Sequence, residues 1–153
     1  MPGSMRLAPD GLGAALSGMR HVPPRVLLVM PDQWPRALLR AALRDAGYDA
    51  LGAPGLAGAL RYRADAPDRG PVRMILIDQG ALIGEDAGAQ LNGLARRHAK
   101  PELVLLGSAG AGPDSTPEGG WRRTVRRPAS IAELVETVRN LIPLPPDAAR
   151  PLD

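Results

Sequence analysis

The chain has 153 residues, of which 44% are hydrophobic and 23% are charged, with a formal net charge of +3. This length suits one globular domain and is sufficient to bury a hydrophobic core. The lack of cysteine in the sequence excludes disulfides, thiolate zinc sites and a cysteine nucleophile. No apolar run approaches the roughly 18 residues that span a membrane, and the chain does not open on a signal-peptide pattern. We therefore expect a cytoplasmic protein with no membrane partner.

The two ends of the chain differ in composition from the middle. Residues 1–24 are rich in glycine, proline and small residues, and Met1–Ser4, ahead of a second methionine, resemble a vector-derived extension. Residues 143–153 contain four prolines and are typical of a tail. We therefore expect a flexible leader over residues 1–24, one folded domain over residues 25–142 and a proline-rich tail.

Within the expected domain, short apolar runs alternate with stretches in which apolar residues recur every three or four positions. The first pattern predicts buried strands and the second predicts amphipathic helices. In chain order we predict strand 25–29, helix 35–46, strand 49–53, helix 55–65, strand 72–77, helix 85–98, strand 103–106, strand 122–126 and helix 130–142. The last helix starts with a capping box, Ser130-Ile131-Ala132-Glu133.

This alternation predicts a fold class. Strands that alternate with helices form a parallel sheet with helices on both faces, and five such strands fit a flavodoxin-like, doubly wound domain. Residues 108–120, SAGAGPDSTPEGG, lie between the fourth and fifth strands and contain two prolines without helical periodicity. We therefore expect the fourth helix of such a domain to be short or missing.

Asp78 directly follows the apolar run 74–77 at the end of the third predicted strand. In doubly wound sheets, binding sites lie at the carboxyl ends of the strands. The carboxylate is therefore either an ordinary strand-end acid facing water or a group held at the rim of a site.

The order of these features resembles the receiver domains of two-component response regulators, the CheY-like family. Residues 25–50, RVLLVMPDQWPRALLRAALRDAGYDA, are similar to the receiver pattern of strand, acidic pair, helix and Gly-Tyr. The resemblance implies that Asp78 stands at the phospho-accepting position and Ser108 at that of the Ser or Thr after the fourth strand. It also implies that Arg127 and Pro128 stand where receivers carry a Lys-Pro element.

The acidic pair of receivers is replaced in this sequence. Receivers use two adjacent acids after the first strand to help bind Mg²⁺, which requires oxygen ligands in octahedral geometry. Met30 and Pro31 occupy the matching positions, and neither has a side-chain oxygen. Asp32 follows them and is either a weak metal ligand or a helix cap. We expect no cofactor, with Mg²⁺ needed only if the receiver is active.

Two further positions depart from the receiver pattern. Arg127 replaces the usual lysine, and a guanidinium forks onto carboxylates, so it could pair directly with Asp78 if the fifth strand places it in the pocket. Thr124 stands where many receivers carry an aromatic switch residue. Both departures weaken the case for phosphorylation-driven switching.

Trp121, Arg122 and Arg123 form the predicted interface, because tryptophan and arginine are enriched at protein–protein hot spots. In a chain without phenylalanine, Trp121 or Trp34 could instead fill a gap in the core. The arginines of residues 122–127 could bind an anion or nucleotide only if they converged, whereas neighbours on a strand point to opposite faces. We read them as a solvated face and expect no nucleic-acid partner.

The sequence therefore predicts a receiver-like signalling module, not an enzyme, that acts by protein–protein interaction without Mg-dependent aspartyl phosphorylation. Its partner would be a signalling protein or a second copy of the chain. The alternative is a phospho-accepting receiver that takes phosphate from a histidine kinase onto Asp78. Met30, Pro31 and Arg127 separate the two interpretations and favour the first.

Overall fold

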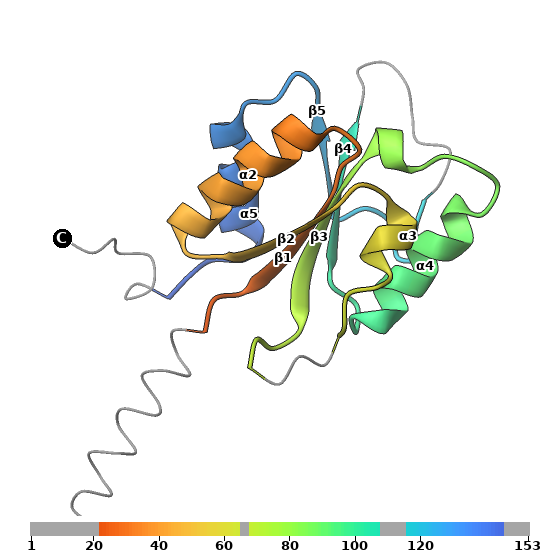
Figure 1. Ribbon diagram of the computed structural model, residues 1–153, viewed down its shortest axis with the longest axis horizontal. Coiled ribbons are helices and arrows are strands. Elements are labelled where there is room, and N and C mark those ends of the chain that lie inside the picture. The colour runs from red at the N-terminus through yellow and green to blue at the C-terminus, as the bar shows by residue number, and fades with distance from the viewer. Residues whose placement is uncertain (1–21, 65–67, 108–115, 146–153) are drawn as a thin grey trace, which may run out of the picture.

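Five parallel strands form one sheet at the centre of the structure, a computed structural model that describes residues 22–64, 68–107 and 116–145. Across the sheet the strands follow the order β2-β1-β3-β4-β5 (Figure 1). They are β1 (Arg25–Val29), β2 (Asp49–Ala53), β3 (Val72–Asp78), β4 (Glu102–Gly107) and β5 (Arg123–Arg126). The order and the parallel pairing confirm the predicted doubly wound, flavodoxin-like fold.

Helices cover both faces of this sheet. The helical elements are α2 (Gln33–Ala46), α3 (Leu56–Ala59), the 3-10 helix η1 (Gln79–Ala81), α4 (Ala87–Arg97) and α5 (Ile131–Leu141). α2 and α5 pack together on one face, and α3 and α4 pack together on the other (Figure 1). Within the described residues, no helix combines the length and the apolar character needed to cross a bilayer.

The core consists of two aliphatic clusters, one on each face of the sheet. Leu28 packs with Leu39 of α2 on one face, and Leu27 packs with Leu91 of α4 on the other. All five residues of β1 are buried. Because helices cover both faces, the central strands carry continuous apolar runs instead of an alternation of apolar and polar residues. This explains why the sequence signal for β1 and β3 was clear.

The capping box predicted at the start of α5 is present. The Glu133 backbone N–H donates to Ser130 Oγ at 3.0 Å, and the Ser130 backbone N–H donates to Glu133 Oε1 at 2.8 Å. These bonds satisfy two amide groups that have no partner inside the helix, and so they fix where α5 begins after β5.

The helix predicted over residues 55–65 is much shorter in the structure, because α3 ends at Ala59. Gly58 lowers the helix propensity of this stretch. In addition, the Tyr62 hydroxyl donates to the backbone oxygen of Gly52 at 2.7 Å. This bond ties the chain to β2 and competes with continued helix.

The connection between β4 and β5 has no helix in its described part, residues 116–122. Glu118 attaches this segment to α4 in two ways. Its backbone N–H donates to Asn92 Oδ1 at 2.9 Å, and its carboxylate pairs with Arg96 at 3.1 Å. The segment therefore covers α4 as a tight turn, with Gly120 at a φ of +77°.

Three predicted regions lie wholly or partly outside the described residues. These are most of the leader (1–21), most of the tail (146–153) and residues 108–115 of the segment predicted to lack a full helix. The predictions for these residues stay predictions.

Candidate functional site

The carboxylate of Asp78 is buried at the carboxyl edge of the sheet and forms an ion pair with Arg127. Arg127 Nη2 contacts Asp78 Oδ2, and the two side chains are 42% and 4% exposed, respectively. The other oxygen, Oδ1, accepts a hydrogen bond from the Gly80 backbone N–H at 2.8 Å. Asp78 is therefore not an ordinary strand-end acid facing water, because both of its oxygens are held by the protein.

β3 brings Asp78 to this edge because it runs one residue past its neighbour. Ile77 pairs in register with Val29, the last residue of β1, and Asp78 pairs with Leu106 of β4. The four apolar residues before Asp78 are all buried, which anchors the strand in the core. The Asp78 carboxylate therefore lies just beyond the last residue of β1, where side chains from other segments can reach it.

Arg127 reaches the same edge from β5. Its backbone N–H donates to the carbonyl oxygen of Gly107, the last residue of β4, at 2.9 Å. The pairing of β5 with β4 therefore continues to Arg127, and the following peptide bond, to Pro128, is cis. The direct pairing of Arg127 with Asp78 that the sequence suggested is present in the structure.

Gly80 is a site residue that the sequence analysis missed. A Cβ atom at this position would lie 3.3 Å from Asp78 Oδ1 and 3.6 Å from Pro31 Cγ. A side chain here would therefore crowd the carboxylate of Asp78 and be in ordinary contact with the proline ring. The only signal in the sequence was a glycine two positions after Asp78.

The positions of the missing acidic pair, Met30 and Pro31, directly follow β1 and supply no side-chain oxygen. Met30 is buried in the core cluster under α2 and α5, and Pro31 is exposed. Arg36 Nη1 donates to the backbone oxygen of Met30 at 2.6 Å, which occupies that carbonyl. Asp32 is exposed and takes the N-cap position of α2, but its side chain makes no cap hydrogen bond. Asp32 therefore occupies the position of a helix cap, but its side chain does not cap the helix.

These residues do not fit the magnesium ion of a receiver. Such an ion requires several oxygen ligands around the acceptor carboxylate. Among the described residues, no three acids, histidines or cysteines cluster closely enough to hold a metal. Asp78 Oδ2 contacts Arg127 and Oδ1 accepts from Gly80, so a cation at this carboxylate would lie beside the positive charge of the guanidinium.

A pocket of about 510 Å³ adjoins the ion pair on its α2–α5 side. Arg127 and Asp32 give it a polar rim, and most of the other side chains are apolar. Its lining is Met30, Asp32, Pro35, Leu106, Arg127, Pro128, Ala129, Ile131 and Leu134. This chemistry suits an apolar side chain from another molecule better than it suits a phosphate.

The predicted interface residues lie at the opposite edge of the sheet from Asp78. The Arg122 backbone N–H donates to the oxygen of Leu103, near the start of β4, at 2.8 Å, and the Arg122 side chain pairs with Glu102 at 3.3 Å. Trp121 is half-buried against the aliphatic core, whereas Arg123 is exposed. The position of Trp121 fits a residue that fills space inside the fold, which was the alternative interpretation.

Of the two remaining predicted residues, only Thr124 is among the described residues. Thr124 is exposed on β5, in register with Leu105. Ser108 lies outside the described residues. The structure thus brings together Asp78 and Arg127 and leaves the interface residues apart from them.

The exposed tryptophan is Trp34, near the start of α2. The residue is 74% exposed, and Leu38, one turn later on the same helix, is 56% exposed. Residues four apart on a helix share a face. Trp34 and Leu38 therefore form an exposed apolar pair, which we call the α2 patch.

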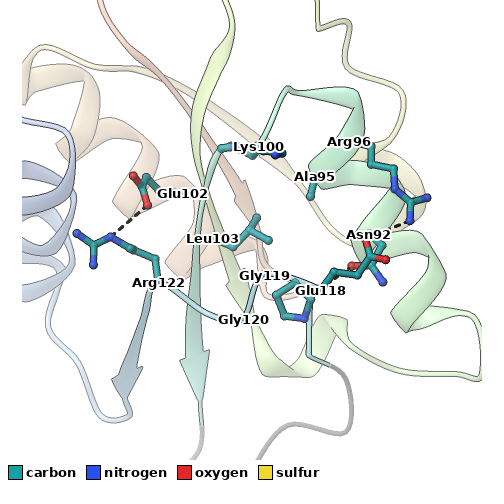
Figure 2. Close-up of a pocket in the computed structure, with 12 residues that line it drawn as sticks. Asn92, Ala95, Arg96, Lys100, Glu102, Leu103, Glu118, Gly119, Gly120 and Arg122 are labelled. Atoms are coloured by element: carbon teal, nitrogen blue, oxygen red, sulfur yellow. Dashed lines mark hydrogen bonds and ion pairs between the residues drawn. The ribbon is translucent and has the colours of Figure 1, made fainter.

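A second pocket, of about 380 Å³, lies between α4 and the segment before β5 (Figure 2). Figure 2 shows the Arg96–Glu118 pair on one side of it and the Arg122–Glu102 pair on the other. Leu103 and Ala95 contribute apolar surface between them. This pocket lies near the amino end of β4, so it is separate from the Asp78 site at the carboxyl end of β3.

No family model and no curated protein matches this sequence. Solved structures do resemble it. A response regulator receiver domain protein (CheY-like) from Methanospirillum hungatei has a TM-score of 0.61 at 15% identity, over 77% of this chain and 92% of that one. A response regulator from Thermotoga maritima has a TM-score of 0.59 at 17% identity, over 78% and 98% of the two chains. A response regulator receiver protein from Pseudomonas putida has a TM-score of 0.55 at 23% identity, over 77% and 97%.

These likenesses establish the fold of the chain, the CheY-like receiver fold, which agrees with the strand order observed here. At such low sequence identity, these likenesses show the fold alone. What the site does must be argued from its own residues.

Proposed function

We propose that the protein is a receiver-like signalling module that works by binding a protein partner, without Mg-dependent phosphorylation of Asp78. The observation that carries this proposal is the ion pair between Arg127 and the buried carboxylate of Asp78. It occupies the position at which a phosphorylated receiver would place a cation and a phosphoryl group.

Phosphorylation of a carboxylate requires a free oxygen to attack phosphorus and a cation to offset the charge that builds up on the transferred group. Asp78 Oδ2 contacts Arg127, and Oδ1 accepts a bond from Gly80. The side chains of Met30 and Pro31 supply no oxygen for a metal. A phosphoryl donor would therefore meet a carboxylate whose charge is already paired with Arg127 and that lacks the usual metal beside it.

The proposed partner surface combines the α2 patch with the neighbouring pocket. Trp34 and Leu38 expose large apolar side chains, and such groups are favourable when a partner removes them from water. Pro35, in the same helical turn as Trp34, lines the pocket together with Ile131 of α5. A partner that covered the α2 patch while inserting an apolar side chain into the pocket would bury both surfaces. A signalling protein, a histidine kinase or a second copy of the chain are the occupants that the sequence interpretation left open.

The test of this function is the intact mass of the protein after incubation with acetyl phosphate and Mg²⁺. We expect no phosphoryl adduct on the wild type and none on Asp78→Asn. Arg127→Lys, which restores the compact cation usual in receivers, is the matched variant and reports whether the guanidinium is what blocks the reaction.

An adduct on the wild type that disappears in Asp78→Asn would instead support the alternative function, a phospho-accepting receiver. A negative result is meaningful only for folded protein, so the amide NMR spectrum of each variant is recorded with the reaction.

A further inference from the structure

The outward face of α2 is apolar over most of the length of the helix. Between its first residue, Gln33, and Arg44, every exposed residue is apolar. These exposed residues are Trp34, Pro35, Ala37, Leu38 and Ala41. The outward face of a surface helix is normally polar. The α2 patch is therefore the larger part of a continuous apolar stripe, in which Ala37 and Ala41 share the face of Trp34 and Leu38.

The two arginines in this stretch of α2 turn back toward the domain. Arg36 Nη1 donates to the backbone oxygen of Met30 at 2.6 Å, and Arg40 Nε donates to the backbone oxygen of Ala50 at 3.1 Å. Both arginines are half-buried. Because the domain holds these guanidinium groups, the middle of the outward face is left without a charge.

A hollow of about 330 Å³ lies near the end of the same helix. Its lining is Ala37, Arg40, Ala41, Arg44 and Asp45. Arg44 and Asp45 are exposed, and no ion pair joins either of them to another described residue. An indole suits this hollow, because its ring packs on the alanines and attracts a guanidinium, while its N–H can donate to a carboxylate.

The chain itself presents one exposed indole. Its aromatic residues are two tryptophans and two tyrosines, and Trp34 is the only exposed one. Trp34 lies seven residues before Ala41, which is two helical turns or about 10 Å along α2. The same helix face thus carries both an exposed aromatic side chain and a hollow that fits it.

This spacing makes the face complementary to a second copy of itself. If two α2 helices run antiparallel, with the centre of the pair between Ala37 and Leu38, each Trp34 lies opposite Ala41 of the other copy. Each Leu38 then lies opposite Ala37 of the other copy. Large side chains meet small ones at both positions, as in well-packed cores, and the contact is reciprocal, as two-fold symmetry requires.

The charge and the size of the face agree with such a contact. Arg44 and Asp45 bring one positive and one negative charge to the end of the face, so two copies of it do not repel each other. One tryptophan, one leucine and two alanines cover less than the roughly 800 Å² that each partner buries in a standard interface. We therefore expect a weak dimer that dissociates on dilution.

We propose that the α2 patch binds the α2 patch of a second copy of the chain, as an antiparallel helix pair in which each Trp34 enters the hollow beside Ala41 of the other copy. This inference rests on the proposed function, because it names the occupant of the surface through which that function works. It places the contact between copies on α2, away from the interface that the sequence predicted at Trp121, Arg122 and Arg123.

Sedimentation equilibrium of the full chain, between about 10 µM and about 1 mM, tests this contact. We expect the average mass to rise with concentration from that of one chain toward that of two. Trp34→Ala should weaken dimerisation by about tenfold or more, because an aromatic side chain that enters a hollow is a typical hot spot. Ile83→Ala is the matched control, since Ile83 is 75% exposed and lies outside α2, and it should leave the Kd within about twofold.

A mixture of two variants tests which residues meet across the pair. Ala41→Glu obstructs the hollow and keeps Trp34, whereas Trp34→Ala keeps the hollow and removes the indole. Each variant alone should dimerise more weakly than the wild type. Their equimolar mixture should have a higher average mass than either variant at the same total concentration, because Trp34 of one variant can enter the hollow of the other. Circular dichroism of each variant verifies that the fold is retained.

Three results would overturn the inference. They are a folded wild type that stays monomeric up to about 1 mM, equal effects of Trp34→Ala and Ile83→Ala, and a mixture no heavier than its separate components. A monomer without a phosphoryl adduct would overturn the second copy as the occupant and not the proposed function. A phosphoryl adduct on Asp78 would overturn the proposed function, whatever the mass of the protein.

Discussion

The guanidinium of Arg127 and the carboxylate of Asp78 form an ion pair in which the acid is almost fully buried and the arginine is half exposed. The two partners are therefore not equivalent. Removing the arginine leaves a buried charge with one backbone hydrogen bond, whereas removing the carboxylate leaves a cation that water can still solvate.

The first prediction concerns the stability that this pair contributes. Arg127→Ala should lower the free energy of unfolding by about 1–3 kcal/mol, because the buried carboxylate loses its counter-charge. Urea unfolding monitored by circular dichroism measures the change. Arg126→Ala, the exposed neighbour on β5, removes the same charge and should change stability by less than about 0.5 kcal/mol.

A double-mutant cycle isolates the pair from the general effect of charge. Asp78→Asn combined with Arg127→Ala should cost less than the sum of the two single variants, with a coupling of about 1 kcal/mol or more. Additive effects would mean that the two side chains do not interact in solution.

The second prediction distinguishes the two tryptophans. Trp121 packs against the core, so Trp121→Ala should lower the free energy of unfolding by about 2 kcal/mol. Trp34→Ala should change it by less than about 0.5 kcal/mol, because that side chain is mostly exposed. Thermal unfolding measures the stability of each variant, and acrylamide quenching measures how exposed its remaining tryptophan is. A larger loss of stability in Trp34→Ala than in Trp121→Ala would contradict these positions.

The third prediction concerns the end of α4. Ala99→Gly should raise the free energy of unfolding by up to about 1 kcal/mol, because glycine adopts a φ of +57° without the penalty that alanine bears. Ala41→Gly, at an exposed position inside α2, should instead lower it by about 0.5–1 kcal/mol. Denaturant unfolding compares the two variants, and a change of the same sign in both would refute the left-handed conformation of Ala99.

The fourth prediction is a pH dependence. Burial, followed by the positive charges of Arg97 and Arg25, lowers the pKa of His98 below its usual value of 6.5. As the pH falls through the unfolded-state pKa, the unfolded chain therefore binds more protons than the folded protein. The stabilising contribution of neutral His98 is fully present above that value, and it is lost as the pH falls toward the lower pKa of the folded state.

His98→Gln should accordingly flatten the fall in the free energy of unfolding from about pH 7 to about pH 5, in zwitterionic buffer without added anions. His21→Gln, the loss of the other histidine of the chain, is measured as the matched control. Equal slopes for wild type and His98→Gln would show that His98 titrates alike in both states.

The parts of the fold that the sequence predicted well are those with strong local signals. β1 and β3 are continuous apolar runs because helices cover them on both sides, and Ser130 with Glu133 forms a capping box within four residues. The position of Asp78 followed from the end of such a run. Each of these signals lies in a short stretch of chain and needs no knowledge of distant contacts.

The features that were missed depend on contacts between distant segments. α3 is short because Tyr62 bonds back to β2, and Gly80 matters only because it lies against Asp78 and Pro31. Nor could the sequence decide which tryptophan is exposed, since burial of Trp121 depends on how the segment before β5 folds over α4. The apolar character of a residue shows that it can be buried, and only the tertiary structure shows whether it is.

The measurement that tests the account most directly is an amide NMR titration with Mg²⁺, followed by Mg²⁺ with beryllium fluoride, on wild type and Asp78→Asn. Beryllium fluoride imitates a phosphoryl group on a carboxylate that has a metal beside it. If Arg127 holds Asp78 as the structure indicates, the wild-type amides near Asp78 should not shift beyond those of the variant. Shifts that require Asp78 and spread to Thr124 would contradict the account and identify a working phospho-receiver.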